Sequence, residues 1–270
     1  MIYALLAPIS ILWLLFFAWP MVQVGLISLY HTNIVSSSFV GLQNYITIFT
    51  DPLTLTVLLN SLLYALILVP LNVFSSLFLA SALYDMSKKW RNAARIILYI
   101  PMLMAGVIIS GFYKWLFHSE GLINYLLPGP TIYFFSDTMT SIPVIAVIVA
   151  IATIGTNLLI VLSSFEALDT DMIDAAKVDG ATRGQINRLI IWPNVLPTII
   201  LITLLTLIGA FQIIETPMML APQDYAATLT YSIYRQAFLF GKYGTAAAQS
   251  VVLLIIVALL KWKVESWQEK

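Results

Sequence analysis

Six long apolar stretches, separated by more polar links of different lengths, dominate this chain. They cover approximately residues 2–30, 53–84, 94–117, 142–165, 195–220 and 245–262. A helix needs about 20 consecutive apolar residues to cross the hydrocarbon core of a bilayer. Because lipid offers the backbone no hydrogen-bonding partners, a spanning segment must be a helix or a strand of a closed barrel. Barrel strands show short alternating segments, whereas these stretches are continuous. The sequence therefore predicts an all-α polytopic membrane protein with six transmembrane helices.

The charge content supports this interpretation. Only 10% of the 270 residues are charged and 60% are hydrophobic, whereas a soluble domain carries roughly 25% charged residues. The net charge of zero gives no indication of a nucleic-acid partner. The absence of cysteine excludes disulfides, thiolate catalysis and cysteine metal sites. The two histidines, His31 and His118, lie far apart in the sequence and do not suggest a metal site.

Basic residues are distributed unevenly between the links. Three of the 13 Lys and Arg residues, Lys114, Arg235 and Lys242, fall on one predicted side of the membrane. The others fall on the opposite side and are Lys88, Lys89, Arg91, Arg95, Lys177, Arg183, Arg188, Lys261, Lys263 and Lys270. Since cytoplasmic links carry the excess of Lys and Arg, both termini and the two basic links are expected in the cytoplasm. The chain 1–270 is interpreted as a single transmembrane domain.

The link after the fourth stretch, residues 166–193, is long, charged and patterned. The acidic residues at 169–174 are typical of a helix start, where the helix dipole favours negative charge. Lys177 suits the last turn of the same helix, and Gly180 suits the left-handed position that follows a helix. This pattern predicts a short helix that ends at Gly180.

A second helix is predicted directly after that glycine. Thr182 and Gln185 have the spacing of a capping box, and apolar residues recur at helical spacing over 186–190. The helix is expected to end before Pro193. From these residues alone, a compact knuckle of two helices and an ordinary amphipathic surface loop explain the pattern equally well.

The same link resembles the coupling-loop signature of the permease subunits of ABC importers. That signature has an acidic residue, two alanines and a glycine, followed after nine residues by isoleucine, any residue, leucine and proline. The matching residues here are Asp174, Ala175, Ala176, Gly180, Ile190 and Pro193. This sequence has Asp174 in place of the usual glutamate and Trp192 in place of the usual leucine.

The resemblance extends over most of the chain and points to the carbohydrate-uptake branch, which includes maltose and glycerol-phosphate systems. Residues 39–45, 155–158 and 228–248 are similar to segments of that branch. One departure lies after the fifth stretch. There the residues at 220–225, Leu-Ala-Pro-Gln-Asp-Tyr, replace the usual Gly-Gly-Pro turn.

The resemblance implies that the link docks on a separate ATPase subunit, as a cytoplasmic coupling-helix loop between the fourth and fifth spans. The sequence contains no Gly-x-x-x-x-Gly-Lys-Ser/Thr motif, so ATP and Mg are expected on that partner. No cofactor, metal or catalytic residue is expected in this chain, which is not predicted to be an enzyme. The implied partners are a second permease subunit of different sequence, two ATPase subunits and an extracytoplasmic solute-binding protein. The implied location is the inner membrane of a bacterial or archaeal cell.

Polar side chains inside the apolar stretches are the candidates for a solute pathway, because they are costly to place in lipid. They are Asn157, Gln212 and Glu215, with Asn72 and Asn60 of the second stretch as weaker candidates. An interhelical hydrogen bond is the commoner role for such amides. Glu215 has a second interpretation, as the partner of Arg235 at the outer mouth of the pathway.

These expectations combine into one functional hypothesis. The chain is predicted to be the transmembrane permease subunit of an ATP-driven importer that translocates a sugar or related solute delivered by a binding protein. The alternative is an ion-coupled secondary transporter or a channel. The scarcity of charged residues within the apolar stretches argues against it, because ion coupling usually uses such residues as relays.

Overall fold

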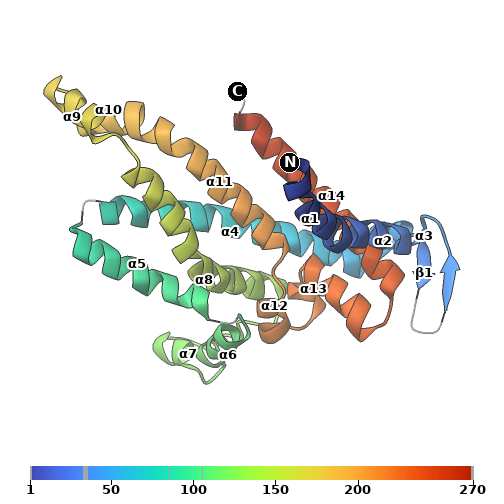
Figure 1. The fold of residues 1–270 in the computed structure, drawn as a ribbon. Coiled ribbons are helices and arrows are strands. Elements are labelled where there is room, and N and C mark those ends of the chain that lie inside the picture. Colours follow the sequence, from blue (N-terminus) through green and yellow to red (C-terminus); the bar gives the residue numbers. More distant parts are fainter. Residues whose placement is uncertain (1, 33–35, 85, 105, 269–270) are drawn as a thin grey trace.

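The computed structural model describes residues 2–32, 36–84, 86–104 and 106–268 of the chain. These residues form a bundle of long helices with a small hairpin at one end (Figure 1). In chain order the elements are α1 (Ile2–Trp13), η1 (Leu14–Ala18), α2 (Trp19–Ile27), β1 (Tyr30–Thr32), β2 (Ser37–Phe39), α3 (Gln43–Thr50), α4 (Pro52–Tyr84), α5 (Lys88–Leu103), α6 (Gly106–Leu116), α7 (Leu122–Leu126), α8 (Thr138–Glu166), α9 (Thr170–Val178), α10 (Arg183–Ile186), η2 (Asn187–Ile191), α11 (Trp192–Phe211), α12 (Glu215–Leu220), η3 (Asp224–Ala226), α13 (Leu229–Tyr234), η4 (Arg235–Leu239) and α14 (Tyr243–Gln268).

Most of these residues belong to helices of membrane-spanning length. Within the described ranges, five helices are long and apolar enough to cross a membrane, and a sixth crossing results if α5 and α6 count as one span. The predicted helical polytopic class is confirmed. The departure from a purely helical fold is the antiparallel pair β1 and β2, in which Tyr30 lies opposite Phe39. Lys270, one of the basic residues assigned to the C-terminal tail, lies outside the described residues.

The third span is bent. α5 and α6 meet at an angle of 95°. Pro101 lies in the last turn of α5, and Met104 after it adopts an extended conformation with φ −83° and ψ 138°. Pro101 has no backbone N–H and so provides no helical partner for the Ile97 carbonyl, which weakens the last turns of α5. The span predicted over residues 94–117 therefore corresponds to two helices, α5 and α6, which form one crossing if they are taken together.

Two apolar clusters form the core between α4, α8 and α11. One contains Tyr64, Ile145 and Phe211, which are fully buried, and the other lies nearer the α9 end and contains Leu162 and Ile202. The outward face of α4 is also apolar: Leu66, Phe74 and Phe78, among others, are more than 70% exposed. Lipid, not water, is the solvent that makes such a surface stable.

Helices α5 and α8 approach each other backbone to backbone at Gly155. A Cβ atom at this position would lie 2.4 Å from the Leu98 carbonyl oxygen and 2.8 Å from the Tyr99 Cα. Small residues of this kind allow close packing of membrane helices, which lack a hydrophobic driving force between them in lipid. Gly155 therefore fixes the position of α5 against the central helix α8.

We expect Gly155→Ala to lower the thermal unfolding midpoint of the purified protein in detergent, because overpacking costs about 1–3 kcal/mol. The matched control is Gly111→Ala in α6, where a Cβ atom would have no neighbouring atom within 4 Å. Alanine at this second site is expected to leave the midpoint unchanged or to raise it, since alanine is the better helix former. Equal midpoints for the two variants would contradict the close contact of α5 and α8.

Candidate functional site

Helix α9 projects from one end of the bundle, and local capping explains where it starts (Figure 1). The Asp169 side chain accepts a hydrogen bond of 2.9 Å from the Asp171 backbone N–H, which is an N-cap contact. Asp171 lies in the first turn and Lys177 in the last, so both charges complement the helix dipole. The predicted acidic start and basic end of this helix are confirmed.

Gly180 ends α9 in the predicted left-handed conformation, with φ +82°. Its N–H donates to the Lys177 carbonyl at 3.0 Å, and the Ala181 N–H donates to the Ala176 carbonyl at 2.9 Å. These two bonds form a Schellman motif, which satisfies carbonyls that the helix end would otherwise leave free. The turn therefore depends on a backbone conformation that other residues adopt at a cost of roughly 1–2 kcal/mol.

The capping box at the start of the next helix is also confirmed. The Thr182 N–H donates to Gln185 Oε1 at 2.8 Å, and the Gln185 N–H donates to Thr182 Oγ1 at 3.3 Å. The two helices are thus joined by a tight connection with a defined geometry at each end. We call residues 166–193, from the end of α8 to the start of α11, the α9 segment.

The second helix does not end before Pro193, so that expectation is wrong. The chain runs without interruption from α10 through the π-helical turn η2 into α11. In this turn the Trp192 N–H reaches the Asn187 carbonyl, five residues back. The wider turn accommodates the proline, which has no N–H and would clash with the Leu189 carbonyl in a regular α-helix. The α9 segment is therefore continuous with the fifth span.

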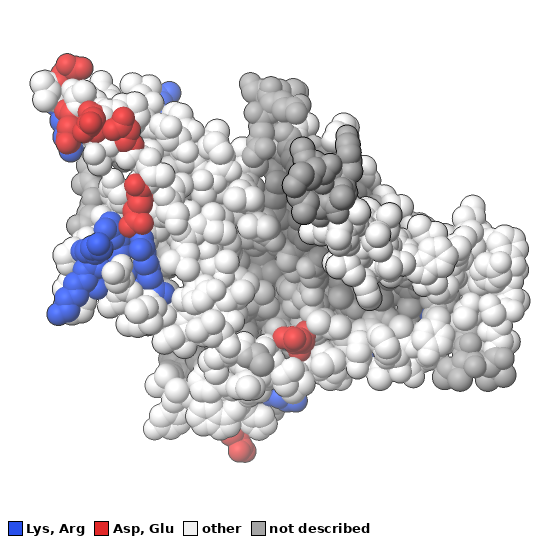
Figure 2. Space-filling view, viewed as in Figure 1, with Lys and Arg blue, Asp and Glu red and all other residues white. Residues whose placement is uncertain are grey.

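The exposed residues of α9 include charged, small and apolar side chains. Asp174 Oδ1 and Lys177 Nζ lie 2.7 Å apart on the surface, with 67% and 60% of their side chains exposed. Ala175 is exposed, Ala176 is half-buried, and Val178 is 88% exposed. Figure 2 shows acidic residues gathered at this end of the molecule. Exposed ion pairs of this type are weak, so both charges remain available to a partner.

A cleft separates the α9 segment from α4. It has a volume of about 1000 Å³ and is lined by Phe74 and Phe78 of α4 and by Asp174, Lys177 and Trp192 of the α9 segment, among others. The segment is anchored on either side of α9, where Leu168 and Ile186 are buried. Within α9, Ile173 packs against the apolar cluster that contains Leu162 and Ile202, while most other residues of the helix are exposed.

A second group of polar residues lies inside the bundle. Asn157 of α8 donates through Nδ2 to Asn72 Oδ1 of α4 at 3.1 Å and to Thr206 Oγ1 of α11 at 3.3 Å. Thr153 Oγ1 donates to the same Asn72 oxygen at 3.1 Å. The two asparagines predicted as pathway residues are thus brought together, and they link three spanning helices.

These residues line a cavity of about 280 Å³ between α4, α5, α8 and α11. Asn72 Nδ2 and Thr156 Oγ1 are buried and have no hydrogen-bond partner in the part of the chain that the structure describes. The described residues around the cavity carry amide, hydroxyl, thioether or apolar groups and no charge. An unpaired buried amide is costly, which makes this cavity a candidate for a polar ligand.

Gln212 and Glu215, the other two predicted pathway residues, do not line this cavity. The fifth span breaks after α11, and both side chains are exposed. The Glu215 carboxylate lies against the first residue of α6, since a Cβ at Gly106 would lie only 1.6 Å from Glu215 Oε2. Arg235 pairs with Asp224 instead of Glu215, with Nη1 and Oδ1 2.5 Å apart. The expected Glu215–Arg235 pair is therefore wrong, because the break turns Glu215 towards α6.

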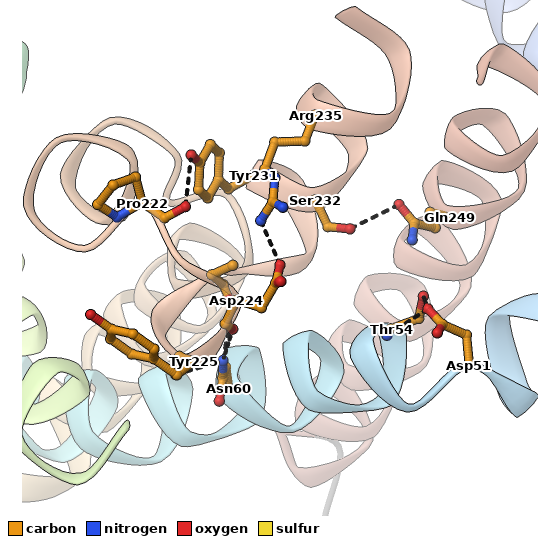
Figure 3. A network of polar contacts seen from close by, with 11 residues as sticks. Asp51, Thr54, Asn60, Pro222, Asp224, Tyr225, Tyr231, Ser232, Arg235 and Gln249 are labelled. Atoms are coloured by element: carbon orange, nitrogen blue, oxygen red, sulfur yellow. Dashed lines mark hydrogen bonds and ion pairs between the residues drawn. The ribbon is translucent and has the colours of Figure 1, made fainter. Parts of the chain in front are cut away.

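The segment that follows this break, residues 221–230, is held on α4 by Asn60 (Figure 3). Asn60 Nδ2 lies within 3.0–3.2 Å of the carbonyl oxygens of Asp224, Tyr225 and Ala227. Asn60 is 2% exposed. This side chain was a weak pathway candidate, and the structure assigns it a role in holding the 221–230 segment.

Two threonines in the same segment donate hydrogen bonds to backbone carbonyls that the break in the fifth span leaves free. Thr230 Oγ1 donates to the Phe211 carbonyl and Thr228 Oγ1 donates to the Ile213 carbonyl. Both carbonyls lie at or just after the end of α11, where no further helical turn can pair them. Sequence reasoning missed these contacts, although the alternation of Thr228, Thr230 and Ser232 in an apolar context is a possible signal for them.

Figure 3 also shows Arg235, which closes the network at this end of the molecule. Besides pairing with Asp224, its guanidinium lies 5.6 Å from the ring centres of Tyr231 and Phe240. Burial, with a smaller effect of the Asp137 carboxylate, raises the pKa of Tyr225, so its hydroxyl stays a neutral donor to the Phe135 carbonyl. The 221–230 segment is therefore packed as an ordered part of the fold.

We expect Asn60→Ala to destabilise the protein by about 1–3 kcal/mol, because it leaves buried carbonyls of the 221–230 segment without a donor. The thermal midpoint should fall, and limited proteolysis should cut within residues 221–230. Asn92→Ala, at an exposed position of α5, is the matched control and should behave like the unmodified protein. Unchanged proteolysis of the Asn60 variant would show that this side chain does not hold the segment.

Comparison with known proteins identifies one protein family. Residues 72–263 match the protein family described as "Binding-protein-dependent transport system inner membrane component". The matched range contains Asn72, Asn157 and the whole α9 segment. It therefore covers the α9 segment and all the polar residues that line the cavity.

Individual relatives match over nearly the whole chain. The chain is 28% identical over 270 residues to the probable ABC transporter permease protein YurN of Bacillus subtilis (strain 168), a match that covers 96% of this chain and 92% of that protein. It is 26% identical over 272 residues to the arabinooligosaccharides transport system permease protein AraP of the same organism, covering 96% and 85%. A chain in the crystal structure of the bacterial alginate ABC transporter, in complex with its alginate pentasaccharide-bound periplasmic protein, has a TM-score of 0.82 at 23% identity and covers 96% of this chain and 91% of that one. This last similarity shows that the fold is shared.

Proposed function

Because the chain belongs to the family of binding-protein-dependent transport system inner membrane components, we propose that its α9 segment receives mechanical work from a separate ATPase subunit. The chain is a multi-pass inner-membrane permease of an ABC importer. Its cavity between α4, α8 and α11 passes a sugar or related solute. The observation that supports the coupling role most directly is the position of α9, which projects from one end of the bundle and is capped at both of its own ends.

Each residue of the signature has a physical task in this proposal. Asp174 presents a carboxylate that a basic or backbone N–H group of the ATPase can bind. Ala175 and Ala176 have small side chains, which allow the ATPase subunit to approach the backbone of α9 closely. Gly180 sets the angle between α9 and the next helix. Ile190 and Pro193, in and after the π-helical turn, make the segment continuous with α11, so that a movement of α9 reaches the fifth span.

The assembly around this chain follows from the same proposal. ATP and Mg are bound by the partner ATPase, since the sequence has no phosphate-binding loop. A second permease subunit completes the pathway, two ATPase subunits bind the two permeases, and an extracytoplasmic binding protein delivers the solute. The α9 segment and both termini face the cytoplasm, an orientation supported by the basic residues of the α4–α5 link and the α9 segment.

We expect Asp174→Ala to reduce uptake by the reconstituted transporter roughly tenfold, because a charge-assisted hydrogen bond contributes about 1.5–3 kcal/mol. Gly180→Asp should have a similar effect by changing the direction of α9. Membrane insertion and thermal midpoint of the isolated chain should not change for Asp174→Ala, since Asp174 contacts only the exposed Lys177 among the described residues. Uptake and ATP hydrolysis are measured in proteoliposomes that contain all subunits.

The matched control is Asp171→Ala, which removes a carboxylate from the first turn of the same helix. It should retain most of the uptake. Full uptake by both Asp174→Ala and Gly180→Asp would refute the coupling role. Uptake by the chain alone, without ATP and partners, would support an ion-coupled carrier or a channel instead.

The cavity favours a neutral solute. A phosphate or carboxylate in it would be an unpaired charge within the bundle, at a cost of several kcal/mol, because the described residues around the cavity supply no cation. A sugar hydroxyl can both accept from Asn72 Nδ2 and donate to Thr156 Oγ1, the two groups that lack partners. The proposed solute is therefore an uncharged sugar rather than a glycerol phosphate.

We expect Thr156→Val to raise the KM for uptake about two- to tenfold, because it removes one hydrogen bond of roughly 0.5–1.5 kcal/mol to the solute. The thermal midpoint should stay the same or rise, since the hydroxyl has no partner in the fold. Thr203→Val, on α11 and outside the cavity, removes a hydroxyl that bonds the Ile199 carbonyl and serves as the matched control. The assay compares neutral and phosphorylated sugars as competitors, and an unchanged KM or preferred binding of the phosphorylated sugars would contradict the proposal.

A further inference from the structure

A cluster of charges ties α5 to the end of α8. Arg95 Nη2 donates to Glu166 Oε1 at 2.6 Å, and Arg91 Nε lies 3.3 Å from the same oxygen. The two arginines lie one turn apart on α5 and so face the same side of that helix. Both are about one-quarter exposed or less, at 20% and 26%, while Glu166 is 35% exposed.

The same cluster includes the end of α4. Arg91 Nη1 donates to the Tyr84 carbonyl at 3.4 Å, in the last residue of α4. The Tyr84 and Phe165 rings pack beside it with their centres 5.7 Å apart. A cation near the C-terminus of a helix is stabilised by the helix dipole. Here Arg91 contacts the last residue of α4 and the last residue of α8. Three helices are thus fastened at a single point.

Glu166 occupies a particular place in the chain. It is the last residue of α8, and α9 begins four residues later at Thr170. Its contacts with α5 are therefore the last polar contacts of the bundle before the chain enters the exposed part of the α9 segment. Figure 2 shows acidic and basic side chains next to each other at this end of the molecule, below the acidic group at the tip.

Helix α5 is the first half of the bent third span. Its middle is held against α8 by the close contact at Gly155, and it turns by 95° into α6. At the start of α6, Gly106 lies against Glu215 of α12, which belongs to the broken fifth span. A small rotation of α5 about its contact with α8 would therefore change the bend and move α6 against α12.

From this arrangement we infer that Glu166 is a positioning residue: its ion pairs with Arg91 and Arg95 make α5 move together with the α9 segment and so transmit that movement to the bent third span. The inference rests on the docking of α9 proposed above. It adds a second route into the bundle, besides the continuous helix from α10 to α11. It also gives the charges on α5 a task beyond orienting the protein in the membrane.

The inference is tested by distance measurements in the assembled transporter. The chain has no cysteine, so pairs of spin labels can be introduced at chosen sites, with the other subunits made cysteine-free. One pair, Lys89→Cys with Val178→Cys, reports the distance between α5 and α9. The other, Lys89→Cys with Tyr125→Cys, reports the angle between α5 and the α6–α7 region. All three positions are exposed.

Distances are compared without nucleotide and with ATP and vanadate. In the otherwise unmodified chain, we expect the α5–α9 distance to stay the same and the α5–α7 distance to shift. Glu166→Gln should reverse this result, because α9 then moves without α5. Glu166→Asp, which keeps the charge, should behave like the unmodified chain. Glu120→Gln, at an exposed position of the α6–α7 connection, is the matched control.

Two outcomes would overturn the inference in different ways. A shift of the α5–α9 distance in the unmodified chain, or identical behaviour of Glu166→Gln and the unmodified chain, would show that Glu166 only stabilises the fold. If neither distance responded to ATP and vanadate in any variant while the assembly hydrolysed ATP, the docking of α9 would fail as well.

Discussion

The satisfaction of backbone hydrogen bonds in lipid is the constraint on which this structure depends. A straight helix satisfies them internally, and each departure from a straight helix needs another solution. After α11 the freed carbonyls of Phe211 and Ile213 accept from Thr230 and Thr228. Near Pro193 the chain widens into a π-helical turn instead. The segment after the fifth span is held by the buried amide of Asn60. Several polar residues of this apolar chain thus pair with backbone groups where helices are interrupted.

These interruptions divide the bundle into parts with different mechanical properties. Helices α4 and α8 are long, uninterrupted and central, and they share both apolar clusters. The third and fifth spans, which contain the breaks, pack around them. A transporter must change shape without exposing its backbone to lipid, and rigid elements with a few defined bends can do so. The contacts at Gly155, at Gly106 with Glu215, and at Glu166 with its two arginines are the points where such bends are tied to the rigid centre.

The sequence was most informative where the signal was local. Long apolar runs predicted the helices, and Gly180, Thr182 and Gln185 predicted the connection after α9, because capping depends on residues within one turn. Prediction failed where tertiary contacts decide. Pro193 was expected to end a helix, but a π-helical turn absorbed it. Pairing with Arg235 was one of two interpretations of Glu215, but a break in the span turned this side chain towards α6. The 95° bend of the third span was not predicted, since proline alone does not distinguish a kinked helix from a broken one.

The paired asparagines show why a polar residue in a span need not have a single role. Interhelical bonding and solute binding were treated as alternatives for Asn157 and Asn72. In the structure, Asn72 Oδ1 accepts from Asn157 and Thr153, while Asn72 Nδ2 is without a partner among the described residues and lies beside a cavity. An amide has separate donor and acceptor groups, so one group can hold the helices together while the other faces the cavity. The acceptor contacts fix the side chain in place, and a donor held in this way needs little reorganisation to bind a hydroxyl. The structural and the binding interpretations of this residue therefore support each other.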